Sequence, residues 1–158
     1  MARIETIFRA ARMLLAVGVT LAAPSAVAHS DEHHDAAYGK PGDPGKVSRT
    51  VEIDMSDAMR FMPASINVRK GETIRFVVKN SGKVKHEMVF GSMKELKEHA
   101  ALMLKFPEME HADPNQLSVD PGKTGELIWR FTKAGTFDFA CLQPGHFEAG
   151  MRGKIAVK

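Results

Sequence analysis

Short segments in which apolar and polar residues alternate recur along the chain after Val47. Apolar side chains recur at every second position in segments 51–55, 66–68, 74–78, 88–90, 127–131, 137–139 and 155–157. A period of two places these side chains on one face of a β-strand. Turn-forming stretches such as Asn80-Ser81-Gly82 separate the segments. The pattern therefore predicts an all-β protein of about seven or eight short strands folded as a β-sandwich.

The segment from Ser92 to Pro107 follows a different period. Ser92 and Glu95 have the spacing of a capping box, in which each side chain accepts the other residue's backbone N–H. Apolar residues then recur at helical spacing as far as Met103 and Leu104. We predict a helical insertion at about 92–118. It consists of one short helix followed by a polar loop from 108 to 118.

The first 28 residues have the composition of a secretory signal. Three arginines precede an apolar run from 13 to 23, and Ala26-Val27-Ala28 has the small residues of a cleavage site. The apolar run is shorter than the ~20 residues that a membrane-spanning helix needs. We predict a signal peptide at 1–28, cleaved after Ala28. The mature protein is then expected in the periplasm, without a membrane anchor.

Residues 29–46 are polar and rich in glycine and proline, and they include His29, His33 and His34. Such a segment has too few apolar side chains to bury. We therefore predict a flexible, histidine-rich arm at 29–46 and a folded domain at 47–158.

The chain has 158 residues, of which 44% are hydrophobic, and its formal net charge is +3. This composition suits one globular domain, and the charge is too small to indicate a nucleic-acid partner. Cys141 is the sole cysteine, which excludes an intramolecular disulfide and any all-cysteine zinc or iron–sulfur site. In an oxidising compartment, an unpaired thiol needs a role that protects it.

Three metal-binding residue types follow the apolar segment at 137–139. His146 comes five residues after Cys141, and Met151 comes five residues after His146. Thiolate, imidazole and thioether are soft ligands that favour copper, and two imidazoles, one thiolate and a weak axial thioether make a type 1 electron-transfer site. Pro144-Gly145 supplies a turn between the ligands. The loop therefore predicts three of the four ligands of one copper ion.

The second imidazole must come from elsewhere in the fold. His86 is preferred because it directly precedes the segment at 88–90, and the rivals are His99 and His111. The proposed ligands also have an ordinary interpretation, since cysteine and methionine are common core residues. Their combination with His146 on one loop favours copper over that interpretation.

These residues resemble the cupredoxin family. The Cys-x₄-His-x₄-Met loop, the Pro-Gly-His triplet and the final Gly-Lys-Ile-Ala-Val segment are similar to those of small blue-copper proteins. The resemblance implies a Greek-key β-sandwich with one type 1 copper, and it implies as ligands His86, Cys141, His146 and Met151. Glu87 departs from the family, because many cupredoxins have an asparagine there that links the two ligand-bearing segments.

The histidines of the arm and the Met/His-containing end of the insertion resemble the periplasmic copper-tolerance cupredoxins of the CopI type. This narrower resemblance implies a role in copper tolerance through Cu(I)/Cu(II) redox binding. Further copper ions are expected, as an auxiliary possibility, at His29, His33, His34, Met109 and His111.

A soluble electron shuttle between periplasmic redox proteins is the alternative function. His146 would then be the electron port, and Pro144 and Phe147 would frame it with an apolar docking surface for a redox partner. An enzyme is not expected, because copper oxidases and nitrite reductases need a second copper centre with several more histidines. Oxidation of Cu(I) driven by the arm stays open.

Overall fold

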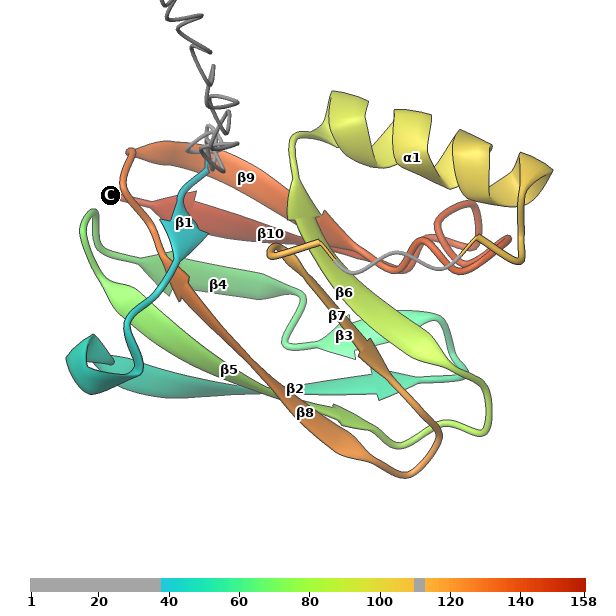
Figure 1. Cartoon of the computed structure of the whole chain (residues 1–158), viewed down its shortest axis with the longest axis horizontal. Coiled ribbons are helices and arrows are strands. Elements are labelled where there is room, and N and C mark those ends of the chain that lie inside the picture. Colours follow the sequence, from blue (N-terminus) through green and yellow to red (C-terminus); the bar gives the residue numbers. More distant parts are fainter. Residues whose placement is uncertain (1–37, 110–112) are drawn as a thin grey trace, which may run out of the picture. The chain divides into compact units, whose positions relative to one another are not determined.

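The structure is a computed structural model that describes residues 38–109 and 113–158. Ten strands form two five-stranded sheets (Figure 1). The first sheet has the order β1 (Lys40–Pro41), β8 (Thr124–Arg130), β5 (Thr73–Asn80), β2 (Arg49–Ser56), β3 (Arg60–Met62). The second has the order β4 (Ser65–Val68), β10 (Arg152–Val157), β9 (Gly135–Ala140), β6 (His86–Gly91), β7 (Gln116–Val119). A short 3₁₀ helix, η1 (Pro44–Lys46), and one α-helix, α1 (Met93–Lys105), complete the described part.

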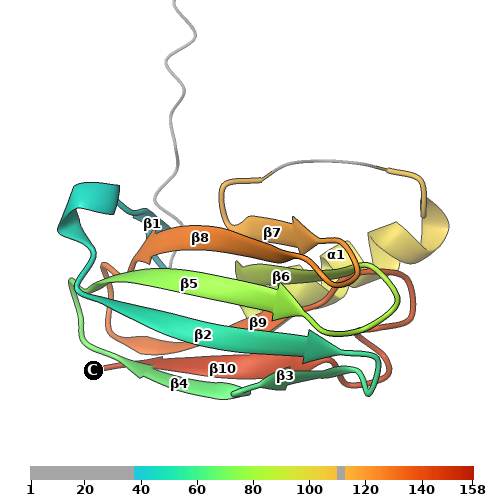
Figure 2. The same cartoon turned by 90° about the horizontal axis from the view of Figure 1, so that it is seen from below.

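The two sheets pack face to face as the layers of a sandwich (Figure 2). β2 pairs in parallel with β5, and β10 pairs in parallel with β4, so strands distant in sequence lie side by side. Aromatic rings fill the space between the layers: Phe61 and Phe139 meet edge to face at 4.9 Å, and Phe76 and Phe90 do so at 5.2 Å. The predicted all-β sandwich with one short helix is confirmed.

Helix α1 forms as the capping box predicts. The Ser92 hydroxyl accepts the backbone N–H of Glu95 at 3.3 Å, and the Glu95 carboxylate accepts the Ser92 N–H at 2.7 Å. The apolar side of α1 then packs on the outer face of β6 and β9. A second buried cluster results, separate from the core between the sheets, and its members are Val89, Leu96, Ala100, Met103, Ala140, Leu142 and Phe147.

The folded part begins earlier than the sequence predicts. The predicted arm extends to Lys46, but β1 lies within it and pairs with β8. Tyr38 is only 7% exposed, and its ring stacks on Trp129 with the centroids 5.9 Å apart. One aromatic side chain among polar neighbours therefore adds residues 38–46 to the sandwich. The arm histidines His29, His33 and His34 and the predicted signal peptide lie outside the described residues.

The predicted polar loop at 108–118 is also wrong at its end. Gln116–Val119 forms β7, which pairs with β6 and places His86 opposite Val119. Two apolar residues, Leu117 and Val119, are too few to show the strand period among polar neighbours. The pattern does not reveal β3 for the same reason, since that strand has three residues.

Within residues 38–109 and 113–158, the structure contains no helix long and apolar enough to span a membrane.

Candidate metal centre

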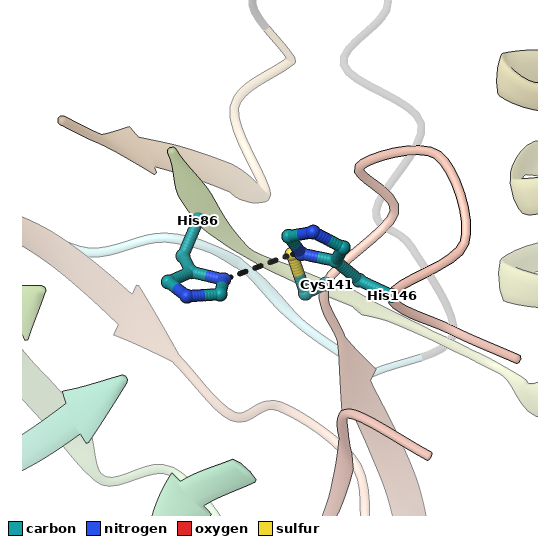
Figure 3. Close-up of side chains that lie close together, drawn as sticks. All are labelled: His86, Cys141 and His146. Atoms are coloured by element: carbon teal, nitrogen blue, oxygen red, sulfur yellow. Dashed lines mark hydrogen bonds between the residues drawn. The ribbon is translucent and has the colours of Figure 1, made fainter. Parts of the chain in front are cut away.

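Three of the predicted ligands lie together at one end of the sandwich. The Nδ1 or Nε2 atoms of His86 and His146 and the Sγ atom of Cys141 all lie within 4.8 Å of one another. Cys141 Sγ is 3.3 Å from His146 Nδ1 and 3.9 Å from His86 Nδ1. Figure 3 shows the three side chains facing one another, with His86 entering from β6 and the other two from the segment after β9. The rival His99 lies on α1, outside this group, and His111 lies outside the described residues.

The loop from Cys141 to Met151 closes on itself through backbone hydrogen bonds. Cys141 N–H donates to the Met151 carbonyl at 3.1 Å, and Met151 N–H donates to the His146 carbonyl at 3.0 Å. Gly145 and Gly150 have φ values of 84° and 89°, a left-handed conformation that glycine adopts without a Cβ clash. The loop can therefore turn sharply enough to bring His146 back over Cys141.

Met151 is the fourth predicted ligand. Its side chain is fully buried and belongs to the same core cluster as Cys141. The two backbone hydrogen bonds of Met151 tie it to both loop ligands. A thioether on a residue fixed in this way suits the weak axial position of a type 1 site.

A carboxylate that the sequence analysis does not single out holds the ring of His86. Asp57 Oδ1 lies 3.3 Å from His86 Nε2, and both Asp57 oxygens accept the backbone N–H of Lys83 at 2.8–3.0 Å. When Nε2–H donates to Asp57, Nδ1 carries the lone pair and faces Cys141. Asp57 lies in the turn after β2, 29 residues before His86, so no local motif connects the two.

Comparison with known proteins identifies the family. The family of copper-binding proteins that includes plastocyanin and azurin matches residues 47–158, which is most of the chain and contains all the proposed ligands. The chain belongs to this family.

Individual relatives agree with the family. The chain is 56% identical over 134 residues to a protein named copper-resistant cuproprotein CopI from Rubrivivax gelatinosus, and the match covers 83% of this chain and 81% of that one. It is 36% identical to a protein of the same name from Pseudomonas aeruginosa, covering 92% and 94%. The fold is similar to that of auracyanin from Roseiflexus castenholzii, with a TM-score of 0.61 and 22% identity over 71% of this chain and 98% of the other.

The donor atoms of this cupredoxin suit copper. Two imidazoles, one thiolate and one thioether from His86, His146, Cys141 and Met151 are the set that selects copper over harder metal ions. Carboxylates, which hard cations prefer, are absent from the His–Cys–His group that the described residues form. The copper would supply one-electron redox chemistry, while the chain holds the ligands in place.

The Cys141 thiol is deeply buried. Burial raises its pKa to about 12, and the nearby charge of Glu87 adds to this, although the backbone N–H groups of Glu87 and Gln143 partly offset it. The Glu87 N–H donates to Cys141 Sγ at 3.4 Å. The metal-free protein therefore holds a neutral thiol at pH 7, and a metal must displace its proton on binding.

His146 is the partly exposed member of the group, whereas His86 and Cys141 are fully buried. Burial lowers the pKa of His146, and the adjacent His86 lowers it further, while Asp57 acts in the opposite direction. The imidazole is therefore neutral at pH 7, with a lone pair available for a metal.

The structure separates the two residues proposed for docking. Pro144 is exposed, but Phe147 is only 7% exposed and packs beneath α1 in the second cluster. The Arg152 guanidinium lies 4.9 Å from the centre of the Phe147 ring. Phe147 therefore supports the loop from below, and its predicted place in an exposed docking surface is wrong.

A cleft of about 720 Å³ is lined in part by Glu87, the residue after His86, and by Gln143, two residues after Cys141. Its lining includes Met103 and Met109 from α1 and the segment after it, and Glu87 from β6. Met109 is 40% exposed. Of the proposed auxiliary set, the structure describes Met109, which shares this cleft with Glu87. Met103 also packs in the cluster beneath α1.

Proposed function

We propose that this protein is a periplasmic type 1 copper protein that contributes to copper tolerance by binding copper and cycling it between Cu(I) and Cu(II). The observation that carries the proposal is the His86–Cys141–His146 group, whose ligand atoms lie within 4.8 Å of one another. The names of the two relatives, which refer to copper resistance, support the tolerance role. The apolar run and the Ala-x-Ala pattern before His29 support export.

The surroundings of the ligands suit a redox site. Cu(I) and Cu(II) prefer different geometries, so electron transfer is fast where the ligands move little between the two states. His86 is held by β6 and Asp57, and Cys141 is held by the Glu87 and Met151 backbones. These contacts come from the fold, so we expect the ligand positions to change little with the oxidation state.

The cleft contains soft side chains that could bind a second copper ion. Met103 and Met109 offer thioethers, which are soft ligands for Cu(I). We propose that this cleft, with His111 and the arm histidines, captures copper before it reaches the Cys141 site. We propose binding rather than enzymatic turnover as the main role, and oxidation of arriving Cu(I) is the activity to test, by oxygen uptake on addition of Cu(I).

An electron shuttle is the second candidate function, and the exposure of His146 favours it. This imidazole is the ligand nearest to solvent, and Pro144 beside it is exposed. A redox partner could therefore dock within short range of the metal. Fast electron exchange with such a partner, compared with a small-molecule reductant, would distinguish a shuttle from a detoxifying protein.

Optical spectroscopy of the Cu(II)-loaded protein tests the proposal directly. We expect an intense thiolate-to-copper band in the visible region, absent from Cys141→Ala. In a deletion strain, wild-type protein should restore growth in copper and Cys141→Ala should not. Met62→Ala, at a methionine that is 71% exposed, is the matched control and should behave as wild type. A wild-type protein without the visible band would contradict the copper site, and normal growth of the deletion strain would contradict the tolerance role.

A further inference from the structure

Glu87 is a buried acidic residue directly after the ligand His86. Its side chain is 3% exposed. Oε1 accepts the backbone N–H of Leu142 at 3.0 Å. Oε2 accepts three side-chain donors: Gln116 Nε2 at 3.1 Å, Ser118 Oγ at 3.3 Å and Gln143 Nε2 at 3.3 Å. One carboxylate therefore joins β6, β7 and the ligand loop.

Hydrogen-bond donors surround both oxygens of the Glu87 carboxyl group. The backbone N–H of Leu142 and the side-chain amides of Gln116 and Gln143 donate to it, and the Ser118 hydroxyl can donate as well. Charge-assisted hydrogen bonds of this kind stabilise a buried anion.

No cation from the described part of the chain pairs with this anion. The ion pairs formed by residues 38–109 and 113–158 include no partner for Glu87. An unpaired buried charge is costly, even where hydrogen bonds surround it. A positively charged metal centre nearby would offset part of this cost.

The charge lies close to the ligands through two short connections. The backbone N–H of Glu87 donates to Cys141 Sγ at 3.4 Å, and its carboxylate accepts the N–H of Leu142, the residue after Cys141. With one thiolate and three neutral ligands, the centre carries a net charge of +1 as Cu(II) and 0 as Cu(I). A buried anion therefore attracts the oxidised centre more than the reduced one, and low solvent screening preserves the difference.

We propose that Glu87 is a positioning residue that holds the ligand loop on β6, and that its buried negative charge favours Cu(II) over Cu(I). This proposal rests on the proposed copper function. The redox step is Cu(II) + e⁻ → Cu(I), with no bond made or broken by Glu87. The consequence is a lower reduction potential than the same ligands would have beside a neutral amide.

Replacing the carboxylate by its neutral isostere tests the charge. Glu87→Gln keeps an acceptor for the Leu142 N–H. Gln116 Nε2 now faces Glu87, so a 180° turn of the Gln116 amide would present Oε1, a buried atom with no partner among the described residues, to the new amide NH₂. We expect the ratio of Cu(II) to Cu(I) affinity, measured by chelator competition, to fall about tenfold. For a one-electron couple this corresponds to a rise of about 59 mV in reduction potential, measured by redox titration.

Glu148→Gln is the matched control, because Glu148 lies in the same ligand loop but is exposed. It removes the same formal charge, but solvent and salt screen that charge. The control should raise the potential clearly less than Glu87→Gln. Equal changes in the two variants, or no change in Glu87→Gln, would overturn the proposal.

A second variant separates charge from position. Glu87→Asp keeps the charge but shortens the side chain, so the potential should stay closer to wild type than in Glu87→Gln. Hydrogen exchange at the Leu142 amide of the metal-free protein should become faster, because its acceptor moves away. Unchanged exchange would overturn the positioning role. A wild-type protein without the visible copper band would instead contradict the proposed function, so the two failures are distinguishable.

Discussion

The two halves of the metal centre are built in different ways. His86 lies on β6, where all six residues are buried and the sheet holds the backbone. Cys141, His146 and Met151 lie on a loop with exposed residues such as Pro144 between them. The strand half takes its geometry from the sandwich, whereas the loop half depends on turns and on side chains that reach across to it. We therefore expect substitutions in the strand half and in the loop half to differ in their effects on copper binding and on stability.

The largest difference is expected between His86 and His146, in whether external imidazole can replace the missing ligand. His86→Gly and His146→Gly should each abolish the native visible band, because each removes a ligand. External imidazole should restore the band in His146→Gly, since that side chain is partly exposed. It should fail in His86→Gly, since that position is fully buried. Titration with imidazole, followed by absorbance, measures the difference, and equal rescue of both variants would refute the comparison.

A large loss of stability is expected where the loop is anchored beneath α1. Leu142 is 1% exposed, and Leu142→Ala should destabilise the metal-free protein by about 2–5 kcal/mol, as for other buried leucines. Pro144→Ala, at the exposed tip of the same loop, should cost much less. Urea unfolding followed by circular dichroism compares them. Similar losses would mean that the loop is not anchored through its buried half.

An intermediate effect is expected from the carboxylate that holds His86. Asp57→Ala should lower Cu(II) affinity by about 10–100-fold, as loss of a partner of a ligating histidine usually does. The Lys83 N–H lowers the pKa of Asp57, so the charged form is present at neutral pH. Asp43→Ala is the control, because Asp43 also accepts a backbone N–H but lies at η1. If both variants bind Cu(II) equally well, Asp57 has no role in the centre.

The smallest effect is expected at Glu72, which does not contact the metal ligands. Partial burial raises the pKa of Glu72, but the Arg69 N–H and the Arg49 guanidinium lower it by more, so it lies below its ordinary value. The carboxylate lies 2.9 Å from Arg49 Nε. Glu72→Gln should remove about 0.2–1 kcal/mol of stability at pH 7, typical of a surface ion pair.

The pH dependence follows from the sign of that shift. Because the pKa of Glu72 is lower in the folded protein than in the unfolded chain, the stabilisation is complete above the unfolded-state pKa. It disappears as the pH falls through the folded-state pKa. The stability difference between wild type and Glu72→Gln should therefore vanish in acid, and Cu(II) affinity at pH 7 should not change. A difference that persists in acid would exclude this ion pair as its cause.

The regular part of the fold can be predicted from the sequence. The alternation at 51–55 and 74–78 corresponds to β2 and β5, and the Ser92–Glu95 capping box marks the start of α1. The elements that the pattern does not reveal are short or polar. β1 and β7 acquire their structure from pairing with β8 and β6, which a local pattern cannot show.

The candidate site can be predicted in part. The spacing of Cys141 and His146 indicates a metal, because a thiolate, an imidazole and a thioether seldom occur so close together on one loop unless they bind one. His86 needs a second, weaker argument from its place before a strand. Asp57 cannot be predicted from the sequence. It lies in a turn of the first sheet, and only the packing of the two sheets brings it to His86 on the second. The sequence places Phe147 at the surface, because the loop residues do not reveal that α1 covers it.

The sequence by itself determined the chemistry of this protein, because the type and spacing of the loop residues restrict which metal they can bind. It also determined longer strands such as β2 and β5, because a period of two is a local property of the chain. Only the tertiary structure showed that the carboxylate of Asp57 reaches His86 and that the carboxylate of Glu87 reaches the ligand loop. The charge of Glu87 and the hydrogen bond of Asp57 depend on burial and on distances between segments far apart in the chain, and these exist only when the sheets pack.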